Sequence, residues 1–165
     1  MNALCRPRRS GQRGFTLMEL VVTLALLGLM SMLAAPLAEL TVQRGRDQEL
    51  REALREIRMA LDRYKAAADQ GLIERKVGDS GYPPDLDTLT SGAPNQKSPG
   101  HEPIYFLRRL PRDPFAPEDL QPASATWGLR SYSSASQSPS AGSDVFDVYS
   151  RAQGLGMNGQ PYREW

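Results

Sequence analysis

An apolar run of 24 residues, from Phe15 to Ala38, dominates the sequence and contains one charged side chain, Glu19. About 20 apolar residues are enough for a helix to cross a bilayer, whereas the apolar core of a secretory signal peptide has about 7 to 15. Residues 1–14 carry four arginines and no acid, which predicts a cytoplasmic N-terminus. The sequence therefore predicts a retained single-pass membrane helix, with the rest of the chain on the far side of the membrane.

Glu19 lies near the start of this run, where a charged side chain needs an explanation. An unpaired carboxylate at that depth costs about 1 to 3 kcal/mol even near the membrane interface. One interpretation is a side chain that reaches back to the water. The other is a positive partner, created when the chain is cut nearby and an α-amine is exposed.

The composition excludes several function classes. Twenty Lys and Arg residues against nineteen Asp and Glu leave a net charge of +1, without the basic excess of a nucleic-acid binder, so no nucleic-acid partner is expected. Cys5 is the only cysteine, so the remainder can form neither an internal disulfide nor a thiolate metal site. His101 is the only histidine, and no G-x-S-x-G or H-E-x-x-H motif occurs, so no enzymatic activity is expected.

After Ala38 the helical pattern continues as an amphipathic helix over 39–70. Apolar residues recur at spacings of three and four: Leu40, Leu50, Ala53, Leu54, Ile57, Ala60, Leu61, Tyr64, Ala67 and Ala68. The charged residues between them are interpreted as a solvated face, with Asp47/Arg51 and Arg58/Asp62 as pairs four residues apart. Gly71 is the first plausible stop, which predicts one helix from Phe15 to about Gln70.

Residues 71–165 are predicted to form a head of short strands, because eleven of the thirteen prolines lie between Pro83 and Pro161. A short helix is predicted over 84–89, and strands over 104–107, 127–133 and 145–150. The serine-rich stretch 133–143 reads as a hairpin loop. Trp127 and Trp165 are interpreted as packing residues rather than ligand-stacking ones. The fold class is α+β, with a long N-terminal helix packed on a small antiparallel sheet.

The string Gly14-Phe15-Thr16-Leu17-Met18-Glu19, with basic residues before it and apolar residues after it, resembles the leader of type IV pilins and type II secretion pseudopilins. The resemblance implies that a prepilin peptidase removes residues 1–14 by cutting after Gly14, and that the exposed Phe15 is N-methylated. It implies that Glu19 pairs with a neighbouring subunit's N-terminus during filament assembly. Pro36 matches the proline that kinks the helix in this family.

The head is similar to the major pseudopilin of type II secretion, through Tyr82-Pro83, the run 110–115, a Trp/Tyr strand and the run 146–150. The resemblance implies a subunit of a short periplasmic filament that supports protein export, anchored first in the lipid bilayer of the inner membrane. Its partners would be other copies of the chain, minor pseudopilins and the inner-membrane assembly platform. The lack of a cysteine after Cys5 favours a pseudopilin over a pilin with a disulfide-closed loop.

One departure from that family concerns calcium. The related pseudopilins bind calcium through several aspartates in the loop after the last strands, but residues 151–162 contain no Asp or Glu. Asp144, Asp147 and Asn158 are the remaining candidate ligands, and the alternative role of the two aspartates is at strand ends and turns. No other cofactor is expected.

Two alternatives stay open from the sequence. A minor type IV pilin for motility, adhesion or DNA uptake would share the leader. A membrane-anchored periplasmic binding module would only mimic it. The exported substrate and the chain's position in a filament are not encoded in any motif found.

Overall fold

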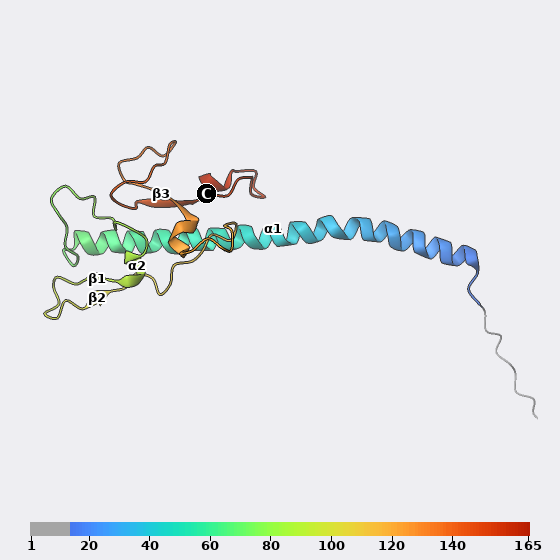
Figure 1. Ribbon diagram of the computed structural model, residues 1–165, viewed down its shortest axis with the longest axis horizontal. Helices are drawn as coiled ribbons and strands as arrows, with labels where there is room; N and C mark the ends of the chain where they lie inside the picture. Colours follow the sequence, from blue (N-terminus) through green and yellow to red (C-terminus); the bar gives the residue numbers. More distant parts are fainter. Residues whose placement is uncertain (1–13) are drawn as a thin grey trace, which may run out of the picture. The chain divides into compact units, whose positions relative to one another are not determined.

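The structure is a computed structural model that describes residues 14–165, with the backbone alone described at 33–38. The chain divides into two compact units, one ending at Thr41 and the other spanning Val42–Trp165. Helix α1 (Leu17–Asp69) contributes to both units (Figure 1). Of the predicted leader, only its last residue, Gly14, lies within the described residues. The arginines of the leader and Cys5 lie outside them.

Local hydrogen bonds define both ends of α1. At its start, the Thr16 hydroxyl accepts the Glu19 N–H at 3.2 Å, and the Thr16 carbonyl accepts the first helical bond from Leu20. Thr16 is therefore the N-cap residue. At its end, Gly71 has a φ of 69°, and the N–H groups of Gly71 and Leu72 donate to the Ala68 and Ala67 carbonyls. This is a Schellman motif, and it confirms the predicted stop at Gly71.

The head contains two small antiparallel sheets. Strands β1 (Ala93–Pro94) and β2 (Pro103–Ile104) form the first, and β3 (Trp127–Arg130) and β4 (Asp147–Ser150) form the second. Helix α2 (Thr88–Ser91) and two 3-10 turns, Ala123–Thr126 and Tyr162–Glu164, complete the head. The α+β prediction is confirmed, with two sheets where one was expected.

Several predicted boundaries are wrong. The strand expected at 104–107 ends at Ile104, because the N–H groups of Phe106 and Leu107 turn to the Leu89 carbonyl instead. The strand expected from 127 ends at Arg130, and the one expected from 145 begins at Asp147, since the Val145 N–H donates to Pro83. The helical turn expected over 84–89 forms at 88–91. The serine-rich stretch joins β3 to β4, as predicted.

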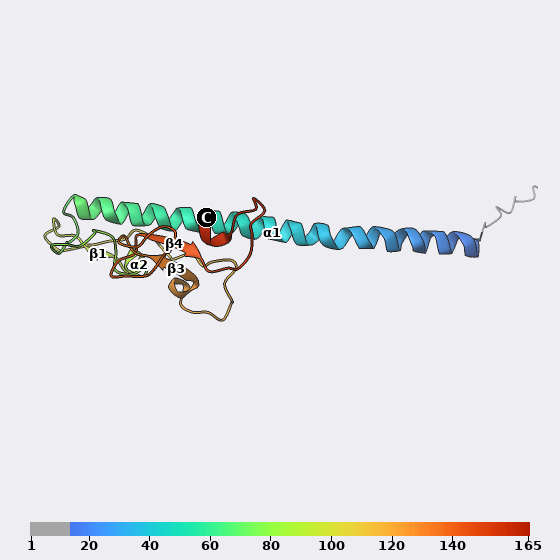
Figure 2. The ribbon, with the colours of Figure 1, turned by 90° about the horizontal axis from the view of Figure 1, so that it is seen from above.

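The core of the head lies between one face of α1 and these short elements. Figure 2 shows them gathered on one side of the C-terminal half of the helix. The predicted apolar stripe supplies one side of the core, with Leu50, Leu54, Ile57, Leu61 and Tyr64 all buried. The other side is made by buried residues of the loops and strands: Leu86, Leu89, Phe106, Trp127, Val145, Val148 and Tyr162. Amphipathic packing of this kind is what stabilises the helix in the head.

Trp127 anchors the second sheet in this core. It is fully buried, and its indole N–H donates to the Pro111 carbonyl at 2.9 Å, so its role is packing, as predicted. The neighbouring Gly128 is required by its partner strand. A Cβ added there would lie 2.3 Å from the Tyr149 ring, closer than any real Cβ contact.

Candidate functional site

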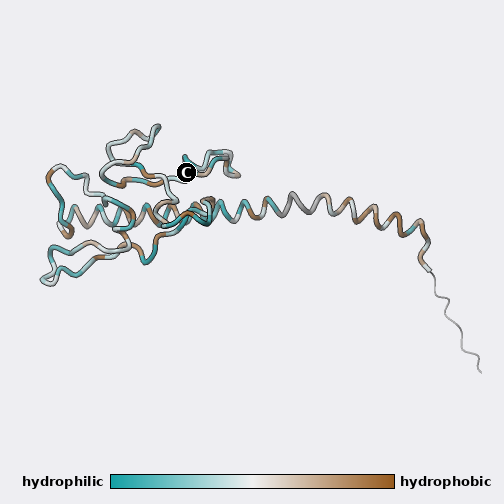
Figure 3. Tube along the Cα trace, in the orientation of Figure 1, coloured by the Kyte–Doolittle hydropathy of each residue, from teal (hydrophilic) through white to brown (hydrophobic). Residues whose placement is uncertain are grey.

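The surface of the chain from Phe15 to Met32, which includes the start of α1, is apolar and exposed. Hydrophobic residues are brown in Figure 3, and they dominate this part of the helix trace. Twelve large apolar side chains here are exposed by about half or more of their surface: Phe15, Leu17, Met18, Leu20, Val21, Val22, Leu24, Leu26, Leu27, Leu29, Met30 and Met32. A helix that is apolar on all sides requires lipid or other helices around it.

The few polar side chains of this segment fit such surroundings. The Thr23 hydroxyl donates to the Leu20 carbonyl at 2.9 Å, and the Ser31 hydroxyl donates to the Leu27 carbonyl at 2.9 Å. Both hydroxyl protons are thus bonded within the helix and need no water. In an apolar environment an unpaired hydroxyl carries a desolvation penalty, which these bonds remove.

The junction between Gly14 and Phe15 precedes the first turn of α1. Both residues are exposed and non-helical. A Cβ added to Gly14 would meet nothing within 4 Å, so the fold itself does not require glycine there. An exposed, non-helical segment beside a helix start is the kind of backbone that a protease can bind.

Glu19 occupies the third position of the helix after the Thr16 cap. Its backbone N–H is satisfied by the Thr16 hydroxyl. A carboxylate in the first turn also interacts favourably with the helix dipole. Its side chain is exposed, and it makes no hydrogen bond or ion pair with any other side chain that the structure describes. Its carboxylate oxygens are therefore free for a group from outside the described residues.

Pro36 lies within α1, and the helical backbone continues through it. Its side chain is outside the described part of the structure, so the predicted kink stays a prediction. Among the helices of the described residues, none combines the length and the hydropathy that crossing a membrane requires.

The three candidate calcium ligands in the head have separate partners. Asp144 links its own loop to two other segments of the head. It accepts hydrogen bonds from the hydroxyls of Ser80 and Ser131 and from the Tyr132 N–H. Burial alone would raise the pKa of Asp144, but the hydrogen bonds from Ser131, Ser80 and Tyr132 hold that pKa below its ordinary value.

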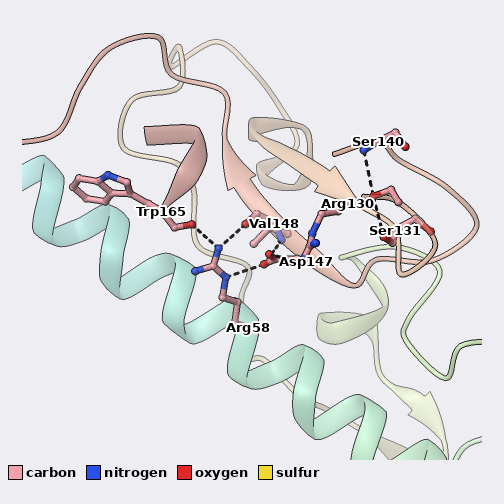
Figure 4. A network of polar contacts seen from close by, with 8 residues as sticks. Arg58, Arg130, Ser131, Ser140, Asp147, Val148 and Trp165 are labelled. Carbon is pink, nitrogen blue, oxygen red and sulfur yellow. Dashed lines mark hydrogen bonds and ion pairs between the residues drawn. The ribbon is translucent and has the colours of Figure 1, made fainter. Parts of the chain in front are cut away.

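Asp147 and Asn158 are also engaged elsewhere. Asp147 forms ion pairs with Arg58 at 2.8 Å and Arg130 at 3.3 Å (Figure 4). Among the described residues, the Asn158 side chain bonds to Gln160 alone, within its own turn. Within residues 14–165, no three His, Cys, Asp or Glu side chains are grouped so that they could hold a metal ion.

The sequence did not predict the buried or half-buried positions of three charged residues, or the long-range contacts that these residues make. Asp47 and Arg58 were assigned to a solvated face, paired with Arg51 and Asp62. Instead, Asp47 is 4% exposed and bonds to the Tyr162 hydroxyl, while Arg58 binds Asp147. The signal was present for Asp47, because it precedes Leu50 and Leu54 at the spacing of the apolar stripe.

Asp113 is the third of these residues. It is 3% exposed, and its two carboxylate oxygens accept bonds from the Phe115 N–H and the Ser150 hydroxyl. It lies in a turn between Pro111 and Pro114. The contact with Ser150 adds that the same turn holds β4 in place.

The head also has an open, mostly polar cleft of about 850 Å³, beside Lys65, Tyr82 and Asp144. Two of its basic residues, Lys65 and Arg75, both form ion pairs with Asp69. Burial and the charges of Asp62 and Asp69, with the neighbouring Tyr132, raise the pKa of Tyr82, so its phenol stays neutral at physiological pH. His101 lies outside this cleft, in an exposed loop.

Comparison with known families identifies one match. Residues 9–35 match the family described as the prokaryotic N-terminal methylation motif. No curated protein and no solved structure matches the chain. This motif indicates a type IV pilin-like protein that is processed as a prepilin, and such proteins are generally structural. It implies processing by prepilin peptidase and assembly with other pilin-like subunits.

Proposed function

We propose that this chain is a pseudopilin, a structural subunit of the periplasmic pseudopilus of a type II secretion system. The methylation motif at residues 9–35 carries the pilin-like part of the proposal. The order of motifs in the head and the lack of any cysteine after Cys5 support the pseudopilin part. In this proposal the filament supports protein export across the outer membrane.

The proposed maturation begins with cleavage between Gly14 and Phe15. The exposed, non-helical backbone of both residues supports access by the peptidase. Methylation of the new Phe15 amine would follow. That amine would begin the chain two residues before α1, with Thr16 as the only residue between them.

Before assembly, the proposed location is the inner membrane, with the apolar run across the bilayer and the head in the periplasm. The sequence run supports this, because it continues through residues 33–38, whose side chains the structure leaves undescribed. The exposed apolar side chains from Phe15 to Met32 would lie in lipid in the monomer and against neighbouring helices in the filament.

Glu19 provides the proposed contact between subunits. Its exposed carboxylate has no partner within the described chain, and each neighbouring subunit would bring one positive amine at its own Phe15. Pairing the two in an apolar filament core gives a charge-assisted hydrogen bond, and it relieves the cost of burying either charge alone. The position of this pair along the helix would set the register between subunits.

Substitution of Glu19 by Leu tests this contact. We expect the variant to be processed and inserted normally but to lose filament assembly. Loss of one partner leaves the other charge buried and unpaired, which costs about 3 to 5 kcal/mol per contact. Sheared filaments would be quantified by immunoblotting, together with the secreted protein in the medium.

Glu39→Leu is the matched control, because Glu39 is an exposed glutamate on the same helix. It should assemble like the wild type. Assembly and secretion at wild-type levels by the Glu19→Leu variant would contradict the proposed pairing between subunits. Filaments that assemble on the cell surface, with secretion intact when the gene is deleted, would instead identify a minor type IV pilin.

A further inference from the structure

The segment 154–162 lies beside the part of α1 that belongs to the head, and it contains no carboxylate of its own. We propose that this segment is fixed to α1 by a contact centred on Asp47 that needs no metal ion. We call the contact of Asp47 with Met157 and Tyr162 the Asp47 clasp. This inference concerns the stability of the head and does not depend on which filament the chain forms.

The geometry of the clasp uses both oxygens of one carboxylate. The Tyr162 hydroxyl donates to Asp47 Oδ1 at 2.7 Å, and the Met157 backbone N–H donates to Asp47 Oδ2 at 2.9 Å. Asp47 and Tyr162 are both buried, at 4% exposure each. A buried carboxylate requires donors of this kind, because an unpaired one would lose its hydration without compensation.

Further contacts hold the residues on either side of the segment to the same face of α1. The Arg58 guanidinium donates to the main-chain oxygens of Val148 at 3.2 Å and Trp165 at 2.6 Å (Figure 4). Arg58 follows Asp47 by eleven residues, or about three helical turns, so both side chains leave the helix in nearly the same direction. Between them, the Arg51 guanidinium lies over the Trp165 ring, 4.4 Å from its centroid.

Inside the segment, close packing fixes the loop against the last residues. The Gly156 N–H donates to the Gln160 carbonyl at 2.9 Å, which closes the turn. A Cβ added to Gly156 would lie 1.9 Å from the Trp165 ring, so only glycine allows this approach. The Tyr162 ring in turn packs on Phe115, with 4.3 Å between the ring centroids. The loop is thus held by side chains of this chain at both of its ends.

The donor set does not fit calcium. Calcium takes six to eight oxygen ligands, with carboxylates prominent among them. The segment supplies no carboxylate. Both carboxylate oxygens of Asp47 already accept bonds from N–H or O–H donors. Asp113, the other buried carboxylate, is bonded through both oxygens to Phe115 and Ser150. Every buried side-chain polar atom of the described residues has a hydrogen-bond partner, so no such atom requires an ion to satisfy it.

Hydrogen–deuterium exchange on the full-length protein in detergent tests the clasp. Exchange would be followed by mass spectrometry in peptides that cover 154–162, with millimolar calcium or with chelator. We expect the wild-type peptides to exchange at the same rate in both conditions. We expect Asp47→Asn to speed their exchange about tenfold or more in both, because it weakens two charge-assisted bonds.

Asp62→Asn is the matched control, since Asp62 is an exposed aspartate on the same helix whose side chain makes no hydrogen bond to any described residue. This variant should exchange like the wild type. Peptides from 50–68 report whether Asp47→Asn unfolds the whole head. If it does, Tyr162→Phe removes one donor while keeping the ring, and should speed exchange in 154–162 alone. Faster exchange of the wild-type segment in chelator, or unchanged exchange in both Asp47→Asn and Tyr162→Phe, would overturn the proposal.

Discussion

Gly14 has no neighbour in the structure that would require glycine at its position. No described residue approaches its Cβ position, whereas the end of α1 depends on the positive φ of Gly71. We therefore attribute the requirement for glycine at residue 14 to a molecule that binds this segment. In our account that molecule is the prepilin peptidase.

Replacement of Gly14 by Leu separates processing from folding. We expect the variant to fold normally but to accumulate in the membrane with residues 1–14 still attached, because a bulky side chain would block the peptidase's site beside the cut. Electrophoretic mobility and circular dichroism measure the two properties. Gly45→Leu, another open position on α1, should be cut as usual. Normal cleavage of Gly14→Leu would contradict a leader of this type.

Residues whose role depends on distant parts of the chain were the hardest to predict. Glu19 and Gly14 belong to a short contiguous motif, so the sequence alone was enough to select them, and their roles stay predictions. Asp47 and Arg58 were misassigned because their partners, Tyr162 and Asp147, are 115 and 89 residues away. Pairing rules for residues four apart on a helix cannot foresee such contacts.

At the scale of elements, α1 was the most predictable part of the chain. Its apolar stripe and the glycine that ends it are local signals, and it begins and ends within two residues of the predicted bounds. Strands β1 and β2 were poorly predicted because each has two residues and contains a proline. Such strands exist only because neighbouring loops hold them together, which no periodicity can show.

The loop that joins β3 to β4 depends on the ionisation of Asp144. The folded state lowers the pKa of Asp144, so folding favours its charged form. This stabilisation is present above the ordinary aspartate value of 3.8 and is lost as the pH falls through the lower, folded value. We expect Asp144→Asn to melt at a lower temperature than the wild type at neutral pH, with the difference shrinking below pH 3.8. Melting curves of both proteins at a series of pH values check this, and a difference that stays constant into acid would contradict it.

At the scale of the whole molecule, the two compact units differ in where their apolar side chains lie. The exposed apolar surface is concentrated before Thr41, whereas the buried core belongs to Val42–Trp165. The fold class and this division could be anticipated from the change in composition after Ala38. The contacts that close the head, through Asp47, Arg58 and Asp113, could not.

A fragment that starts at about Thr41 is therefore expected to be a soluble monomer. Its apolar stripe is covered by the head, so little driving force for association remains. Light scattering would measure its mass. Thermal melts with millimolar calcium and with chelator should nearly coincide, because a site poor in carboxylates would bind at about 1 mM or weaker. A dimer, or a melting temperature raised by about ten degrees with calcium, would count against our account of the head.

The central claim is that the mature chain begins at Phe15 with a methylated amine. Intact mass analysis of the protein, purified from cells with and without prepilin peptidase, tests it most directly. Our account predicts a mass that corresponds to residues 15–165 plus one methyl group when the peptidase is present, and the uncut chain when it is absent. A protein that keeps residues 1–14 in both strains, or one that is cut near Ala35, would contradict it.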